Sequence, residues 1–454
     1  MVCQGFSNTV RMVARAEGLS DTRVVEMPPP NIAVKSTEEV QAMAADLIDG
    51  VIAALTTPVA ITPRRGAAPA SAPAASLSNA RAAREIVFKG DLQEINAHFV
   101  NNVWCDGLPI VPPTLDLVDE MLSLTDRSPD EVIGVLKPKN LNATVWTVAV
   151  NGVMAGCKPE YMPVMLAIVE AIADPRFGVE HIGSTAGWTP LILLNGPIIK
   201  QLGFASGQGV MLPQTQANMS VSRFLRLCLL NIAGYRLGET DMASFGRNYY
   251  PVLAEAEDLS AWPPSSTDRG FAAGDNVVTV QSADVISHSF LSIGDAEQHL
   301  RHIAYEVSRE LGGSILYHME HFGGEVSPII CLSPLVAGII ARAGYSKDDV
   351  RRFLFEHAKV PAWQFDDRLN RSQSGLNLHQ AVKAGRLSAE FALSDDPNRM
   401  VPVVHKPEEF YIVVAGSPDR NRNFIAGQIG EQGLNVSKAI TVSDAWTKRF
   451  AGSD

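Results

Sequence analysis

A stretch rich in alanine, proline and serine divides this 454-residue chain into a short and a long part. Residues 63–83 carry few bulky side chains that could anchor them to a core, a composition typical of mobile linkers. An alanine-rich helix is the alternative, and Pro63, Pro69 and Pro73 argue against it. We therefore expect three parts: residues 1–62, the linker 63–83, and residues 84–454.

The short part carries the helix, strand, helix pattern of an α/β layer. Apolar periodicity predicts a helix over Asn8–Glu17 and a short strand over Val24–Met27. Ser36 and Glu39 form a capping box, which predicts a second helix reaching about Leu55. Two such helices need more strands than this part supplies. We interpret it as a partial Rossmann-like layer whose open strand edges predict a homo-oligomer or a small partner subunit.

The long part alternates helices with apolar strands, which indicates a large α/β or α+β fold in one unit or two. Thr114 and Ser346 are expected to cap helices. A helix over Met162–Ala173 is apolar almost all round, which predicts that it is buried. The strand candidates are Leu191–Leu194, Val277–Val280 and Phe410–Ala415. No repeat of fixed period is visible.

Composition excludes several classes of protein. Lys and Arg number 38 against 49 Asp and Glu, so the net charge of −11 argues against a nucleic-acid partner. No apolar run approaches the roughly 18 residues that a membrane span requires, and no secretory signal is visible. The five cysteines form no CxxC pair, which indicates reduced thiols and a cytoplasmic location.

Two segments carry candidate catalytic residues. The loop Trp104–Thr114 contains Asp106 in a turn followed by three prolines, a rigid approach to a helix N-terminus that could face an anion. Cys157 precedes Lys158 and a helix expected near Glu160, a setting that lowers a thiol pKa. Glu160 or Asp106 would then carry the proton. The alternatives are a structural loop and an inert buried cysteine.

A third segment carries candidate substrate contacts. The strand ending at Asn195 is followed by Gly-Pro and then by a loop containing Gly207 and Gly209, the place where open α/β sheets bind ligands. Its spacing matches no nucleotide motif, and turn formation alone accounts for the glycines. Asn218 and Arg223 are candidate contacts for a carboxylate or phosphate.

Histidine spacing offers a weak metal signal. The pairs with a spacing of three are His299 with His302 and His318 with His321. Residues at this spacing share a helix face and can meet one metal ion, but the spacing is common by chance and surface or capping roles are the favoured explanation. The sequence therefore requires no metal and no cofactor. No GxSxG elbow is present, so a serine hydrolase has no local support.

Several of these motifs resemble the UGSC-motif (seleno)protein family and its larger companion domain. The matching segments are Asp106–Thr114, Ala149–Pro163, Asn195–Pro197, Ala217-Asn218, Gly344–Lys347 and Ile412–Gly416, and the first sixty residues are similar to the second half of the small UGSC domain. Cys157, Asp106, Asn195 and Asn218 lie at matching positions. The defining motif, selenocysteine or Cys followed by Gly-Ser-Cys, is absent. We expect it upstream of Met1 or on a separate small subunit.

The resemblance implies thiol or selenol redox chemistry, with a distant similarity to the substrate-activating selenoprotein subunits of glycine reductase-type systems. We therefore expect a thiol- or selenol-dependent oxidoreductase acting on a small anionic organic molecule, with reductive carbon–heteroatom cleavage suggested by the distant similarity alone. Cys157 would act as the thiolate, supported by Lys158. A non-redox lyase or hydrolase, metal-assisted through the histidines, is one alternative. A non-catalytic subunit of a two-component enzyme is another.

Overall fold

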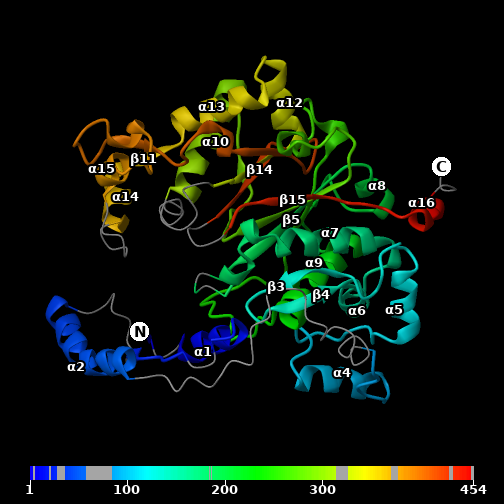
Figure 1. Cartoon of the computed structure of the whole chain (residues 1–454). Coiled ribbons are helices and arrows are strands. Elements are labelled where there is room, and N and C mark those ends of the chain that lie inside the picture. Colours follow the sequence, from blue (N-terminus) through cyan, green and yellow to red (C-terminus); the bar gives the residue numbers. More distant parts are fainter. Residues whose placement is uncertain are drawn as a thin grey trace.

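The computed structural model describes residues 1–3, 6–19, 22–27, 36–57, 84–183, 185, 187–312, 326–369, 377–428 and 433–450 (Figure 1). They form helices and mixed sheets, which confirms an α/β or α+β fold. The expected linker at 63–83 lies outside these residues. Among the described helices, none combines the length and apolar character that a membrane span requires.

The N-terminal part is a small parallel pair of strands with two helices. Its elements are β1 (Val2–Cys3), α1 (Ser7–Ala16), β2 (Glu26–Met27) and α2 (Thr37–Thr56). Val2 lies opposite Glu26 in parallel register, and the predicted capping box of Ser36 and Glu39 is present. Asn140 of the long part donates to the carbonyl of Ala16 at 3.1 Å. Two paired strands do not establish a Rossmann-like layer, so that finer expectation is not confirmed.

A helical layer follows. Its elements are α4 (Leu92–Asn101), α5 (Leu115–Leu122), β3 (Val132–Leu136), β4 (Leu141–Thr144), α6 (Val145–Ala155), η3 (Pro159–Tyr161), α7 (Met162–Ala173), η4 (Pro175–Phe177), η5 (Val179–His181), α9 (Gln216–Cys228) and a π-helix, η6 (Leu229–Ala233). Side chains of Asp91, Thr114 and Thr144 cap α4, α5 and α6. The prediction that α7 is buried is confirmed, because nearly all its residues lie in the core.

Two sheets of the same topology lie beyond this layer. The first has the order β15–β7–β5–β6 and the second β13–β10–β14–β8, with β9 also paired to β14. Their strands are β5 (Thr189–Asn195), β6 (Val252–Ala254), β7 (Val277–Ala283), β8 (Val285–Ile286), β9 (Phe290–Leu291), β10 (Ile329–Leu332), β13 (Tyr411–Val414), β14 (Arg422–Gly427) and β15 (Val436–Ala439). The three predicted strands correspond to β5, β7 and β13.

The two sheets exchange an outer strand. In each, a parallel pair (β5 with β6, β10 with β13) is followed by an antiparallel strand (β7, β14). The chain leaving β7 forms β8, which pairs with β14, and the chain leaving β14 forms β15, which pairs with β7. This internal similarity was not visible as a sequence repeat.

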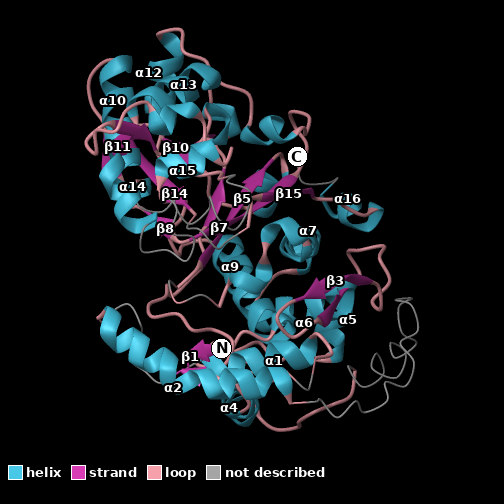
Figure 2. Cartoon of the chain, turned by 60° about the vertical axis from the view of Figure 1, so that its left-hand side comes forward, coloured by secondary structure: helices cyan, strands magenta, loops and turns pink. Residues whose placement is uncertain are grey.

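Helices cover the sheets on both sides. Figures 1 and 2 place α7 and α9 on one side of the strands and α10, α12 and α13 on the other. The remaining elements are α8 (Ile198–Leu202), η7 (Glu257–Leu259), η8 (Ser265–Arg269), α10 (Ala296–Leu311), α12 (Pro334–Arg342), α13 (Lys347–His357), β11 (Lys359–Pro361), α14 (Ala362–Leu369), α15 (Leu378–Lys383), η9 (Ala389–Ala392), β12 (Met400–Pro402), η10 (Pro407–Glu409) and α16 (Asp444–Phe450). One apolar core lies under each helical layer and a third between the sheets.

Candidate functional site

The helical layer surrounds a cavity of about 770 Å³, here called the Trp104 pocket. Its lining residues are 84–88, Ile95, Phe99, Trp104, 112–116, Trp146, Val150, Asn151, Met154, Asn231 and Arg236. The pocket opens to solvent, because lining residues such as Val87 and Leu115 are exposed. Two segments that the sequence singled out, Trp104–Thr114 and Ala149–Pro163, meet here.

The turn that presents Trp104 has a left-handed backbone. The C-terminus of α4 is closed by the N–H of Trp104, which donates to the carbonyl of Phe99 at 2.9 Å. Between them Val103 has φ +54°, a conformation that favours glycine and strains a β-branched residue. The Trp104 ring then packs edge-on against Phe99, with the centroids 5.6 Å apart. The turn thus places an aromatic wall in the pocket.

The proline-rich loop that follows is tied to two helices. The N–H of Ile110 donates to Asn96 of α4 at 2.7 Å. The N–H of Val111 donates to the carbonyl of Met154 at the end of α6, at 3.4 Å. Thr114 then caps α5, as predicted. These bonds hold Pro112 and Pro113 against the pocket.

Two polar side chains of the pocket are held by this same turn. Asn231 of the π-helix donates to the carbonyl of Trp104 at 3.0 Å and to Oδ1 of Asn151 at 2.9 Å. Arg236 donates from Nη1 to the carbonyl of Val103 at 3.0 Å. Consecutive carbonyls of the strained turn therefore fix both groups. Single π-helical turns are frequent at functional sites.

A strap formed by residues 84–88 covers one side of the pocket. The guanidinium of Arg84 lies 4.8 Å from the Trp146 ring centroid and pairs with Asp130 at 3.0 Å. The Phe88 ring stacks on His98 at 4.4 Å. Sequence reasoning missed Asn231, Arg236 and Trp146. The one available signal was a lone Asn between Leu230 and Ile232 in an apolar run.

Cys157 does not have the environment predicted for it. Its side chain is buried, and burial raises the pKa of the thiol to about 12, against which a hydrogen bond with Ser220 acts only weakly. The structure therefore does not support the expected thiolate at this position. Lys158 is exposed, and Glu160 is paired with Arg449 at 2.9 Å. Desolvation of the buried sulfur is the largest effect on this pKa. The N–H of Cys157 donates to the carbonyl of Gly152 at 2.9 Å, at the C-terminus of α6.

Asp106 and Arg223 pair with each other. The guanidinium makes two hydrogen bonds to the carboxylate, at 3.0 and 2.8 Å, and a third to the carbonyl of Leu108 at 3.0 Å. Both side chains are largely buried. The pair clamps the proline-rich loop to α9, so neither the predicted proton carrier nor the predicted anion contact has a free charge.

Asn218 is also fully occupied within the protein. Its Oδ1 accepts from the N–H of Ala205 at 3.0 Å and from Thr215 at 2.5 Å. Its Nδ2 donates to the carbonyls of Val210 and Val252, both at 3.1 Å. An amide with all four positions bonded has none for substrate, so the structure does not support the expected substrate contact.

Gly207 and Gly209 form the turn that Asn218 ties down. The carbonyl of Gly207 accepts from Val210 at 3.2 Å, and that of Gly209 accepts from Leu212 at 2.7 Å. Gly209 has φ +75°, which favours glycine. Turn geometry accounts for both residues, and the structure assigns neither a ligand.

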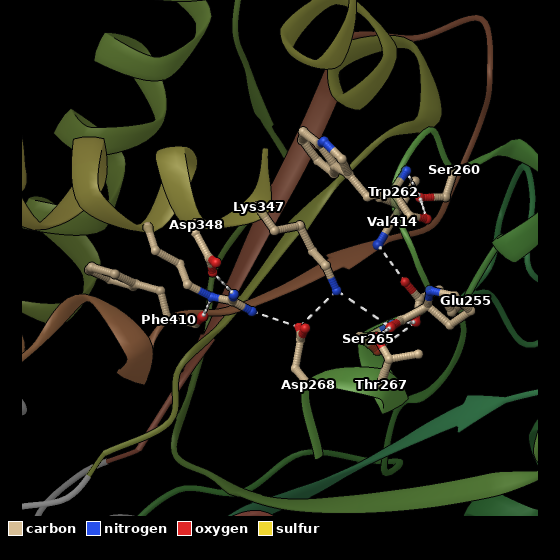
Figure 3. Close-up of polar contacts among 12 residues, drawn as sticks. Glu255, Ser260, Trp262, Ser265, Thr267, Asp268, Lys347, Asp348, Phe410 and Val414 are labelled. Atoms are coloured by element: carbon tan, nitrogen blue, oxygen red, sulfur yellow. Dashed lines mark hydrogen bonds and ion pairs between the residues drawn. The ribbon is translucent and has the colours of Figure 1, made fainter. Parts of the chain in front are cut away.

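Figure 3 shows part of a polar cluster around Glu255, Ser265 and Lys347, where the two sheets meet. The buried Asn195 belongs to this cluster. It donates to Glu255 at 2.5 Å and to Glu257 at 3.0 Å. Ser265 donates to Glu255 from its N–H at 2.9 Å and its hydroxyl at 2.5 Å. Burial raises the pKa of Glu255, while the bonds from Ser265 and Asn195 and the charge of Lys347 oppose that shift.

Charged residues from η8 and α13 extend this cluster. Lys347 pairs with Asp268 at 2.8 Å, and Arg351 pairs with the same carboxylate at 2.6 Å. The N–H of Ala256 donates to the carbonyl of Val414 at 2.8 Å, joining the ends of β6 and β13. These contacts hold the sheets together, so Asn195 contacts the protein and not an open pocket.

The predicted histidine pair His299 and His302 does not form a metal site. His299 is buried with Nδ1 2.7 Å from the Ser292 hydroxyl, and Nδ1 of His302 accepts from the N–H of Ile293 at 3.2 Å. His318 and His321 lie outside the described residues. Over the described part of the chain, no three His, Cys, Asp or Glu side chains approach one another as metal ligands would.

Comparisons of this chain with protein-family models, with curated proteins and with solved structures found no match. The resemblance to the UGSC-motif family therefore stays a prediction.

Proposed function

We propose that this chain binds a small, mostly apolar organic molecule in the Trp104 pocket. One observation carries the proposal: a cavity of about 770 Å³ with an apolar, aromatic lining on which Asn231 and Arg236 converge. Small-molecule sites have this size range and this combination of many apolar walls with few polar groups. Trp104, Trp146 and Phe99 favour a ring or hydrocarbon body in the ligand.

The pocket supports binding more directly than it supports catalysis. The described lining holds no cysteine and no histidine, and its carboxylates, Glu85 and Asp116, are exposed. The Thr114 hydroxyl is used to cap α5. We therefore favour the non-catalytic alternative: a substrate-binding component of a two-component enzyme. In thiol or selenol redox chemistry of the predicted kind, the partner would supply the reacting group.

We also propose a cytoplasmic location. The four cysteines whose side chains the structure describes are free thiols. A reducing compartment keeps thiols in this state. As part of the same proposal, this chain associates with a partner subunit or with a second copy of itself.

The neutral fluorescent probe N-phenylnaphthylamine tests pocket binding directly. The Val150→Trp variant adds an indole to the pocket wall, so we expect the dissociation constant of the probe to rise about tenfold or more. The matched control is Val132→Trp, which changes an exposed strand residue outside the pocket and should leave the constant unchanged. Equal binding by both variants, or no binding by the unmodified protein, would overturn the proposal.

A further inference from the structure

Arg236 is the cation of the Trp104 pocket that has no acidic partner among the described residues. It is half-buried, whereas the lining acids Glu85 and Asp116 are exposed. The other lining arginine, Arg84, is paired with Asp130 at 3.0 Å. A half-buried charge interacts more strongly with a ligand than an exposed, screened one does.

The Arg236 side chain is held in place by one hydrogen bond and keeps further N–H donors for a ligand. One hydrogen bond, from Nη1 to the carbonyl of Val103 at 3.0 Å, fixes it to the left-handed turn. A guanidinium has five N–H donors arranged to meet a carboxylate with two parallel bonds. The adjacent carbonyl, that of Trp104, fixes Asn231 in the same way. The strained turn therefore holds a cationic side chain in the wall of the cavity.

We propose that the ligand is an apolar organic acid whose carboxylate binds Arg236 and whose apolar body lies along Trp104 and Trp146. This inference rests on the proposed function, because it names the ligand class of the same pocket. Trp104 and Trp146 offer flat apolar surfaces, and the cavity of about 770 Å³ leaves room for a body larger than the acid group. The carboxylate replaces the acidic partner that Arg236 lacks within the described structure.

Competition against bound N-phenylnaphthylamine tests the ligand class. Decanoate and decanol share one chain and differ in the acid group. We expect decanoate to displace the probe from the unmodified protein at a concentration about tenfold or more below that required for decanol. A charge-assisted hydrogen bond predicts a difference of this size. This preference should weaken with added salt. Equal displacement by the acid and the alcohol would overturn the inference without affecting the proposed function.

Variants assign the preference to one residue. Arg236→Gln should abolish the preference for decanoate over decanol, and Arg236→Lys should retain part of it. The matched control is Arg301→Gln, an exposed helix arginine outside the pocket, which should behave as the unmodified protein. A preference that survives in Arg236→Gln contradicts the inference. If the unmodified protein does not bind the neutral probe, the proposed function is contradicted instead.

Discussion

Cys157 lies next to the exposed Lys158, and its thiol is buried with Ser220 of α9 as its hydrogen-bond partner. Two opposing effects act on this sulfur. The hydrogen bond with Ser220 lowers the pKa of the thiol, whereas removal from water raises it. The pKa of about 12 shows that desolvation dominates.

We expect Cys157 to resist iodoacetamide in the folded protein. With a pKa of about 12, roughly one thiol in ten thousand is ionised near pH 8, and the sulfur is buried as well. Mass spectrometry after timed labelling measures the extent of modification, with labelling in denaturant as the positive control. Rapid modification of Cys157 before unfolding would show that the site opens and would restore it as a reactive thiol.

Sequence reasoning at the residue scale found polar groups but not their partners. Asp106 was predicted to carry a proton and Arg223 to contact a substrate, and the two side chains contact each other across 117 positions of the chain. Asn218 was also predicted to contact a substrate, and its amide joins a loop, a helix and a strand. Whether a side chain is free depends on contacts between distant segments, which local spacing does not contain.

At the scale of elements, local signals performed better. The caps at Ser36, Thr114 and Ser346 are where sequence placed them, because a cap satisfies N–H groups only two or three residues away. The end of α4 is different. Val103 occupies a left-handed position for which glycine is the usual residue, so the sequence lacks the glycine that commonly marks a helix end.

Val103→Gly should stabilise the protein. Relief of the left-handed strain is worth about 1 kcal/mol, partly offset by the greater freedom of glycine in the unfolded chain. Val100→Gly is the matched control: it makes the same change in an exposed residue of the same helix and should destabilise by about 0.5–1 kcal/mol. Urea unfolding of both variants measures the difference. A loss of stability in Val103→Gly equal to that in Val100→Gly would show that the turn is unstrained.

At the scale of the whole molecule, the exchange of outer strands joins the two sheets. β8 and β15 each leave one sheet and pair with the other, so neither sheet is complete without the far half of the chain. Three of the strands, β5, β7 and β13, were predicted from their apolar runs. Their pairing was not, because it joins residues such as Val280 and Val436 that lie far apart in the sequence.

Glu255 lies at the junction of the sheets and should make stability depend on pH. Because burial raises the pKa of Glu255, the folded protein holds this proton at pH values where the unfolded chain has lost it. The contribution of this group to the free energy of unfolding is therefore greatest below pH 4.5, the ordinary pKa of glutamate. It is lost as the pH rises through the pKa of Glu255 in the folded state. The slope is at most about 1.4 kcal/mol per pH unit.

Glu255→Gln removes that titration while keeping the shape of the side chain. We expect the stability of the unmodified protein, measured relative to this variant by urea unfolding, to fall as the pH rises above 4.5 and then to become constant. Glu297→Gln, a change in an exposed helix residue, corrects for the altered net charge. A relative stability that rises over the same pH range would mean that the hydrogen bonds from Ser265 and Asn195 outweigh burial. Glu255 would then act as a buried anion that holds the two sheets together.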